Sequence, residues 1–153
     1  IDFPEELSQV HFIKLRLLDD KGKQVGSNFY WRSKDSYEGA KTLTGPATSG
    51  FESINQLPKV RLSAKYKTRT DSGNYYIDIE LKNSSRNIAF FTQIQFLDRN
   101  NKPVRPSFYT DNFFSLLPGE SRKVTIDTAV SKVLDNSLVI KGWNVEEQRF
   151  KLK

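Results

Sequence analysis

The stretch FIKLRLLDDKGKQVGSNFYW, residues Phe12–Trp31, returns later in the chain as FTQIQFLDRNNKPVRPSFYT, residues Phe91–Thr110. The two stretches align without a gap at an offset of 79 positions (91 − 12), and seven of the twenty pairs are identical. This offset is longer than the roughly 20–50 residues of solenoid repeats, and it suits tandem β-sandwich domains of about 100 residues. The repeat therefore predicts two related β-sandwich units.

The two copies differ in their surroundings. Only eleven residues precede the first copy, whereas strand-like sequence flanks the second on both sides. We therefore expect the terminal strands of one immunoglobulin-like domain at 1–33 and a complete domain at 58–153, in a piece cut from a longer protein. Residues 34–57 are rich in Ser, Gly and Thr and show no sustained period, which predicts an inter-domain linker. Its few apolar side chains, such as Tyr37 and Leu43, are expected to lie across a domain surface.

Alternation of apolar and polar residues with period two dominates the second half. It is typical of antiparallel sheets that are packed on one face. Turn signals separate the alternating runs, at Asp71–Asn74, at Asp98–Asn101 with its counterpart Asp19–Gly22, and at Pro118-Gly119. The pattern predicts an all-β chain: an immunoglobulin-like antiparallel β-sandwich of about six or seven strands, preceded by a β-hairpin remnant of a neighbouring sandwich domain. The one helical candidate is Thr128–Leu134. The apolar runs are Val60–Tyr66, Tyr75–Leu81, Thr92–Phe96, Val124–Ile126 and Leu138–Val145.

Composition excludes several classes of function. The net charge is +6, but the basic residues are spread along the chain without a run of five, so we expect no nucleic-acid partner. No run approaches the 18 apolar residues of a membrane helix, so we expect no membrane partner. Cysteine is absent, which excludes disulfides, thiol catalysis and thiolate metal sites, and it leaves the compartment undecided. We expect no cofactor and no metal.

No set of catalytic residues emerges from the sequence. The single histidine, His11, has no second His or Cys with which to share a metal, and we expect it to lie on the surface at a strand edge. Nucleophile elbows and phosphate-binding loops are missing. The adjacent pairs Asp19-Asp20 and Glu146-Glu147 point to opposite faces of a strand, so neither pair can flank one glycosidic bond.

Two groups of residues invite a binding role. Tyr109, Asp111, Asn112 and Phe113 alternate aromatic and polar side chains, as in a loop that faces a sugar or an enzyme barrel. The alternative, which we favour, is a core strand with a turn, because the Phe-Tyr pair also occurs in the first copy. Of the two tryptophans, Trp143 is expected in the core and Trp31 at an interface between domains.

Several motifs together resemble the C-terminal region of family 2 glycoside hydrolases, in the β-mannosidase and exo-β-D-glucosaminidase branch. The motifs are Asn28–Trp31 (NFYW), Leu57-Pro58, Asp111–Glu120 (DNFFSLLPGE) and Gly142–Val145 (GWNV). The resemblance implies a large, multi-domain, retaining exo-glycosidase, periplasmic or secreted, whose two catalytic glutamates lie in a (β/α)₈ barrel outside this chain. It carries no catalytic residue onto this sequence. Gln148–Lys153 is expected to add an edge strand.

The leading hypothesis is a non-catalytic accessory sandwich whose partners are the other domains of the parent enzyme, with loops that approach its active-site mouth. One rival is a stand-alone carbohydrate-binding module with an oligosaccharide partner, which predicts an exposed row of Tyr37, Tyr76, Tyr109 and Phe113. Another is a tandem-sandwich adhesin with no enzyme attached. A lone hairpin is marginal in water, so we expect the N-terminal hairpin to dock on the sandwich or to form a dimer through its open edge. Its exposed apolar residues would be Leu15, Leu17, Phe29 and Trp31.

Overall fold

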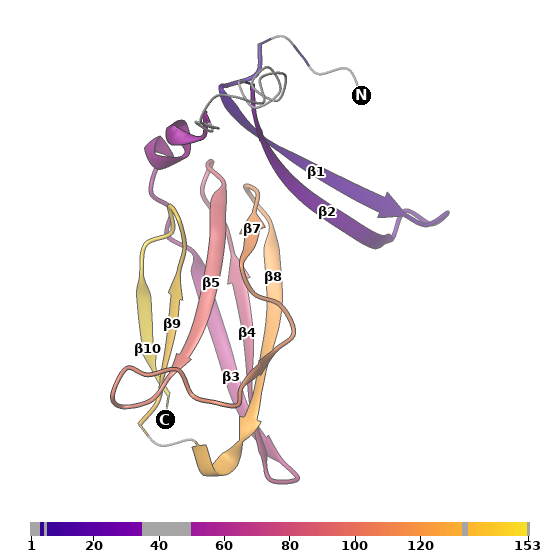
Figure 1. The fold of residues 1–153 in the computed structure, drawn as a ribbon. Coiled ribbons are helices and arrows are strands. Elements are labelled where there is room, and N and C mark those ends of the chain that lie inside the picture. The colour runs from indigo at the N-terminus through magenta and orange to yellow at the C-terminus, as the bar shows by residue number, and fades with distance from the viewer. Residues whose placement is uncertain (1–3, 5, 35–49, 133–134, 153) are drawn as a thin grey trace, which may run out of the picture. The chain divides into compact units, whose positions relative to one another are not determined.

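The computed structural model describes residues 4, 6–34, 50–132 and 135–152. It divides the chain into two compact units, Ile1–Leu57 and Pro58–Lys153 (Figure 1). Tyr37, Leu43 and Leu134, to which the sequence assigned roles, lie outside the described residues. The regular elements of the described part, in chain order, are β1 (Val10–Leu18), β2 (Gln24–Ser33), the 3₁₀ helix η1 (Glu52–Gln56), β3 (Ser63–Asp71), β4 (Asn74–Lys82), β5 (Ala89–Leu97), β6 (Phe108–Tyr109), β7 (Phe114–Leu116), β8 (Ser121–Ala129), the 3₁₀ helix η2 (Val130–Lys132), β9 (Ser137–Lys141) and β10 (Gln148–Lys151).

In the first unit, β1 and β2 form an antiparallel hairpin. One carboxylate oxygen of Asp19 holds its turn, accepting the backbone N–H groups of Lys21 (3.0 Å) and Lys23 (2.8 Å). The expectation of a surface His11 is wrong, because this side chain is only 8% exposed. Gly50 lies at the end of the hairpin where Val10 pairs with Ser33, since the Ser33 hydroxyl donates to the Gly50 carbonyl oxygen at 3.0 Å.

The segment predicted as a linker contains an element that the sequence did not reveal. The short 3₁₀ helix η1 buries Ile54, and its first and last backbone bonds run from Ile54 N–H to Phe51 O and from Leu57 N–H to Ile54 O. This turn could not be predicted in a segment rich in Ser, Gly and Thr, because a single 3₁₀ turn is too short to show a helical period.

The second unit is an immunoglobulin-like β-sandwich, which confirms the predicted fold class. One sheet has the strand order β3-β4-β8-β6 and the other β10-β9-β5-β7, and all the strand pairs are antiparallel (Figure 1). Sequence-distant strands are neighbours in both sheets, so the chain passes repeatedly between the two layers. The expected C-terminal edge strand is present as β10. One isolated parallel bridge, between Val60 and Val145, lies outside the named strands.

Alternating side chains of both sheets meet in one core. Most apolar positions of the predicted period-two runs are almost fully buried, while Ala64 and Tyr66 are partly buried. Each buried aliphatic or aromatic side chain contributes roughly 1.5–3 kcal/mol. The buried side chains include Ile77, Ile79 and Leu81 of β4, Ile94 and Phe96 of β5, Val124 and Ile126 of β8, and Leu138 and Ile140 of β9. The prediction that Trp143 belongs to this core is wrong, since β9 ends at Lys141 and the indole is 52% exposed.

The turns agree closely with the sequence signals. β3 and β4 are joined by the two left-handed residues Ser72 and Gly73, with Asp71 paired to Asn74. The helical candidate Thr128–Leu134 is wrong at Thr128 and Ala129, which belong to β8, and the described residues that follow, Val130–Lys132, form a 3₁₀ turn. Val133 and Leu134 lie outside the described residues. Over the described residues, no helix has the length and apolarity to cross a membrane, and no three His, Cys, Asp or Glu side chains come together as metal ligands.

Candidate interaction surface

Four aromatic side chains meet on the second unit, and we refer to them as the aromatic cluster: Phe90, Phe91, Phe113 and Trp143. The ring centroid of Phe90 lies 5.9 Å from that of Phe91 and 6.4 Å from that of Trp143, and Phe91 lies 5.5 Å from Phe113. Phe90 is buried, whereas Phe91 is 39% and Phe113 51% exposed. The cluster therefore has a buried base and three rings open to solvent.

A β-bulge at the start of β5 contains Phe91. β5 pairs with β7 at Ala89–Leu116 and at Thr92–Phe114, so two residues of β5 stand opposite the single residue Ser115. The Ser115 hydroxyl oxygen accepts the Phe91 N–H at 3.2 Å, and Phe91 has a φ of 52°. Phe91 lies on the same outward face of β5 as Gln93 and Gln95, and the bulge is where its backbone takes the left-handed conformation.

The DNFF motif positions Phe113 through its asparagine. The Asn112 amide oxygen accepts the Ile94 N–H (2.8 Å), and its amide nitrogen donates to the Ile94 carbonyl oxygen (2.9 Å). A side chain thus makes the pair of bonds that a neighbouring strand would make to β5. Phe113 comes next with a φ of 57° and faces solvent, while Phe114 turns into the core.

The GWNV motif positions Trp143 in a similar way. Asn144 is 1% exposed, and its amide accepts the Phe90 N–H (2.8 Å) while donating to the carbonyls of Ile88 (2.8 Å) and Pro58 (2.7 Å). Gly142 is required beside it, because an added Cβ would lie 3.0 Å from the Phe90 carbonyl oxygen and 2.9 Å from a methyl carbon of Val145. These contacts fix the chain on both sides of Trp143.

The other residues proposed for the sugar-facing loop make internal contacts. The Tyr109 hydroxyl oxygen accepts the Phe96 N–H at 3.0 Å, and burial raises the pKa of Tyr109 against the smaller opposing effect of that bond. Asp111 pairs with Arg122 at 2.9 Å. Of the proposed loop residues, Phe113 is thus the one that the structure brings into the aromatic cluster. That this loop faces a sugar or a barrel stays a prediction.

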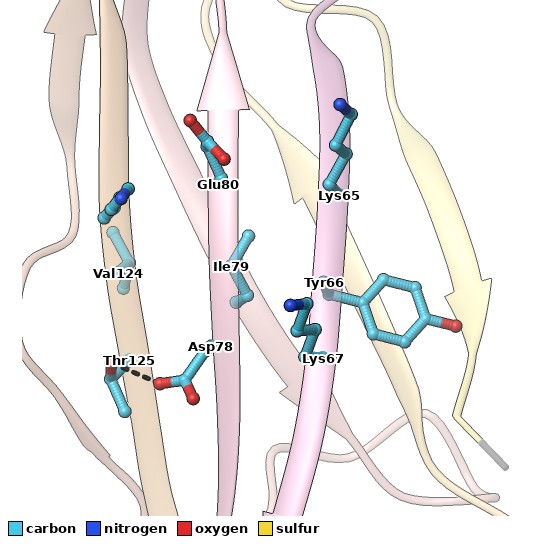
Figure 2. A pocket seen from close by; sticks show the side chains of 9 residues that line it. Lys65, Tyr66, Lys67, Asp78, Ile79, Glu80, Val124 and Thr125 are labelled. Atoms are coloured by element: carbon cyan, nitrogen blue, oxygen red, sulfur yellow. Dashed lines mark hydrogen bonds between the residues drawn. The ribbon is translucent and has the colours of Figure 1, made fainter.

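A second feature is an open groove on the outer face of the β3-β4-β8 sheet, with a volume of about 550 Å³. Figure 2 shows that β4 supplies its carboxylates, Asp78 and Glu80, between lysines on the flanking strands. The register places Lys65 and Lys123 on either side of Glu80, and Lys67 and Thr125 on either side of Asp78. Opposite charges across neighbouring strands stabilise a sheet modestly.

Asp78 is held in its ionised form. The hydroxyl of Thr125 donates to it at 2.8 Å (Figure 2), and Arg69 approaches it at 3.1 Å. The Thr125 bond is the largest influence that lowers the pKa of Asp78, Arg69 acts in the same direction, and partial burial opposes both. A general acid needs a raised pKa, so Asp78 is not suited to that role, and the paired charges give the groove the character of a charge-paired sheet face.

Tyr76 does not belong to the aromatic cluster, and Trp31 is part of the other unit. The guanidinium of Arg69 lies 3.9 Å from the ring centroid of Tyr76 and covers that ring. The described members of the aromatic row expected for a carbohydrate-binding module therefore do not form one flat platform. Trp31 lies in the hairpin opposite Phe12, and its role as an interface anchor stays a prediction. Sequence reasoning missed Phe90, which is buried, and Phe91, which is exposed, and it assigned Trp143 to the core.

Comparisons with known proteins agree with the fold. Residues 42–145 match the family described as the exo-β-D-glucosaminidase Ig-fold domain. An exo-β-D-glucosaminidase of Streptomyces avermitilis is 31% identical over 153 aligned positions, which cover 93% of this chain and 17% of that protein. A crystal structure of the exo-chitosanase CsxA of Amycolatopsis orientalis matches with a TM-score of 0.81 and 27% identity, over 99% of this chain and 19% of that one.

The mannosidase side of the resemblance is weaker. A mannosylglycoprotein endo-β-mannosidase of Lilium longiflorum is 29% identical over only 47% of this chain. The chain spans less than a fifth of the length of the relatives it matches, 17% for the Streptomyces avermitilis protein. The DNFFSLLPGE and GWNV motifs thus led to the correct branch of family 2 glycoside hydrolases, and the chain belongs to the family of exo-β-D-glucosaminidase Ig-fold domains.

Proposed function

We propose that this chain is a non-catalytic, C-terminal accessory β-sandwich of a larger retaining exo-glycosidase that acts on β-D-glucosaminides. Its role is structural: it packs against the other domains of that parent enzyme. The observation that carries the proposal is the family match over residues 42–145. The ionised, ion-paired state of Asp78 agrees with it, because a carboxyl group with a lowered pKa is poorly suited to act as a general acid.

The choice of glucosaminidase over mannosidase rests on coverage. The exo-β-D-glucosaminidase of Streptomyces avermitilis aligns with 93% of this chain, whereas the endo-β-mannosidase of Lilium longiflorum aligns with 47%. A domain that belongs to one enzyme branch throughout its length is expected to serve an enzyme of that branch.

The first unit is, in the same proposal, the end of a preceding immunoglobulin-like domain at residues 1–33, with 34–57 connecting it to the sandwich. The repeat supports this. Ile94 and Phe96 are buried by the opposite sheet of the sandwich, whereas their counterparts Leu15 and Leu17 are 44% and 66% exposed. A sister sheet supplied by the parent enzyme would cover that face of the hairpin.

The test is an activity assay on two polypeptides: the 153-residue chain and the product of the full reading frame that contains it. With p-nitrophenyl β-D-glucosaminide, the longer product should hydrolyse the substrate and the chain should not. Hydrolysis by the purified chain would refute a non-catalytic role. A longer product that cleaves only the β-mannoside would refute the glucosaminidase assignment.

A further inference from the structure

The backbone of the aromatic cluster is held in an unfavourable conformation. Among the described non-glycine residues with positive φ, Ser72, Asn101 and Asp135 are small or polar, as is usual for the left-handed region. Phe91 and Phe113 are the bulky exceptions. Residues held in such regions concentrate at binding and switch sites, because the surrounding structure must over-determine them. Both exceptions belong to one exposed group of rings.

The cluster is also rigid in its construction. Phe113 and Trp143 each adjoin an asparagine, Asn112 and Asn144, whose amide bonds to the backbone of β5. A backbone that is fixed in this way loses little conformational freedom when a partner binds to the rings it carries, which favours affinity. Aromatic residues at the centre of a patch are the usual anchors of protein interfaces.

The chemistry of the cluster favours a protein partner over a sugar. The ring planes are inclined by 46° between Phe90 and Phe91, by 46° between Phe91 and Phe113, and by 63° between Phe90 and Trp143. Inclined rings offer no flat platform for a pyranose. The amide of Asn144, the nearest polar group by sequence to Trp143, already bonds to three backbone groups, whereas sugar sites need convergent polar groups.

Charged residues flank the cluster on the Trp143 side. The Lys59 ammonium donates to the Trp143 carbonyl oxygen at 3.4 Å, and Arg61 pairs with Glu146 at 3.5 Å. An aromatic centre with a polar rim is the usual anatomy of a protein–protein interface.

We propose that the aromatic cluster docks the apolar surface of a second folded domain of the same polypeptide. The proposal rests on the function proposed above, because relatives such as the Streptomyces avermitilis enzyme hold most of their length outside the region that this chain matches. It names the surface through which the sandwich performs its structural role: Phe91 and Phe113 contact the partner, and Phe90 supports them from below.

The experiment compares amide hydrogen exchange in the 153-residue chain and in the full-length parent, at residues 88–93, 111–115 and 142–145. Docking should slow exchange there by at least about tenfold in the parent. In the parent, Phe113→Ala should reverse most of that protection. Phe113→Gly, which suits the left-handed backbone and so preserves the fold, should reverse it equally.

Phe108→Ala is the matched control, because Phe108 carries the same ring, is 67% exposed and lies on the other sheet. It should leave the protection unchanged. Equal exchange in the chain and the parent, or equal effects of Phe108→Ala and Phe113→Ala, would overturn the proposal. So would calorimetric binding of glucosamine oligomers to the chain, or self-association of the chain in sedimentation, if either is abolished by Phe113→Ala.

The same samples separate this proposal from the proposed function. A parent that hydrolyses p-nitrophenyl β-D-glucosaminide but shows no protection at the cluster refutes the docking surface alone. If amide exchange at the cluster is slowed in the parent but the parent has no glycosidase activity, the proposed glycosidase function is refuted and the docking surface is supported.

Discussion

The two copies of the repeat share a turn, and they differ in the strand that leaves it. In the first, Asp19 accepts the N–H groups of Lys21 and Lys23. In the second, Asp98 accepts those of Asn100 (2.8 Å) and Lys102 (2.9 Å). The left-handed position is Gly22 in one and Asn101 in the other, both of which tolerate positive φ. Identical turn chemistry produces the same turn in both settings.

The returning strands then diverge. In the first copy β2 stays paired with β1 as far as Ser33. In the second, Pro103 and Pro106 stand where the first copy has Gln24 and Ser27. Proline lacks the N–H that a ladder needs, and the chain crosses to the other sheet, where Phe108–Tyr109 pairs with β8. The comparison teaches that the repeat determines the turn, while two prolines decide the partner strand.

The largest expected difference between the copies lies in the buried face. Phe96→Ala should destabilise the sandwich by about 3–5 kcal/mol, because it leaves a cavity in a closed core. The aligned Leu17→Ala should cost about 0.5 kcal/mol or less, as surface substitutions do. Urea unfolding of both variants of the 153-residue chain measures the difference. Equal losses of unfolding free energy in the two variants would mean that Leu17 is buried within this chain as Phe96 is.

Gly142 tests the support of the aromatic cluster. Gly142→Ala should destabilise the sandwich by about 1–3 kcal/mol through overpacking against the Phe90 carbonyl and Val145. Gly26→Ala in the first copy is the control, because its Cβ would meet only the Leu17 Cβ at an ordinary 3.8 Å. Thermal unfolding should show a lower midpoint for Gly142→Ala and an unchanged midpoint for Gly26→Ala. An unchanged midpoint for Gly142→Ala would contradict the close packing of Gly142 against the backbone of the bulge.

The shared turn predicts a smaller and matched pair of effects. Asp98→Ala and Asp19→Ala each remove two hydrogen bonds to backbone N–H groups, with an expected loss of about 1 kcal/mol. Amide exchange of Lys102 should accelerate in the first variant and that of Lys23 in the second. Acceleration in one copy only would show that the turns differ in stability despite their common geometry.

The smallest expected effect is a dependence on pH that belongs to the second unit. Because the folded-state pKa of Asp78 is lowered, its contribution to stability is present above the ordinary carboxyl range and is lost as pH falls through the folded-state pKa. Thr125→Val removes the main cause, so the pKa of Asp78 should rise and the acid-dependent loss should shrink. NMR titration measures this, with exposed Thr68→Val on β3 as the control. A pKa of Asp78 that is the same in both variants would contradict the assignment to Thr125.

Much of the fold could be predicted because its signals are local. Alternation in Tyr75–Leu81 and Thr92–Phe96 reports which side of a strand is buried, and Asp71–Asn74 reports a tight turn. Motif matches then predicted the family. The strand count fell short because Phe108–Tyr109 and Phe114–Leu116 are too short to show a period.

The candidate surface was harder to predict because it depends on contacts distant in sequence. Phe91 takes its left-handed backbone at a bulge against Ser115, and no pattern in its own strand predicts a bulge. Analogy with other sandwiches predicts a core Trp143, but Gly142 and Asn144 end the strand before it. His11 is buried in the hairpin, where β2 ends at Ser33 and bonds to Gly50, a residue distant in sequence.

Native-state hydrogen exchange of the 153-residue chain compares the aligned amides of β1 and β5 directly. If β5 lies inside a complete sandwich while β1 presents a face that a sister sheet should cover, the amides of Ile94 and Phe96 should exchange only by global unfolding of the sandwich. Those of Leu15 and Leu17 should exchange orders of magnitude faster through local opening. Equal protection of the two strands would contradict the account.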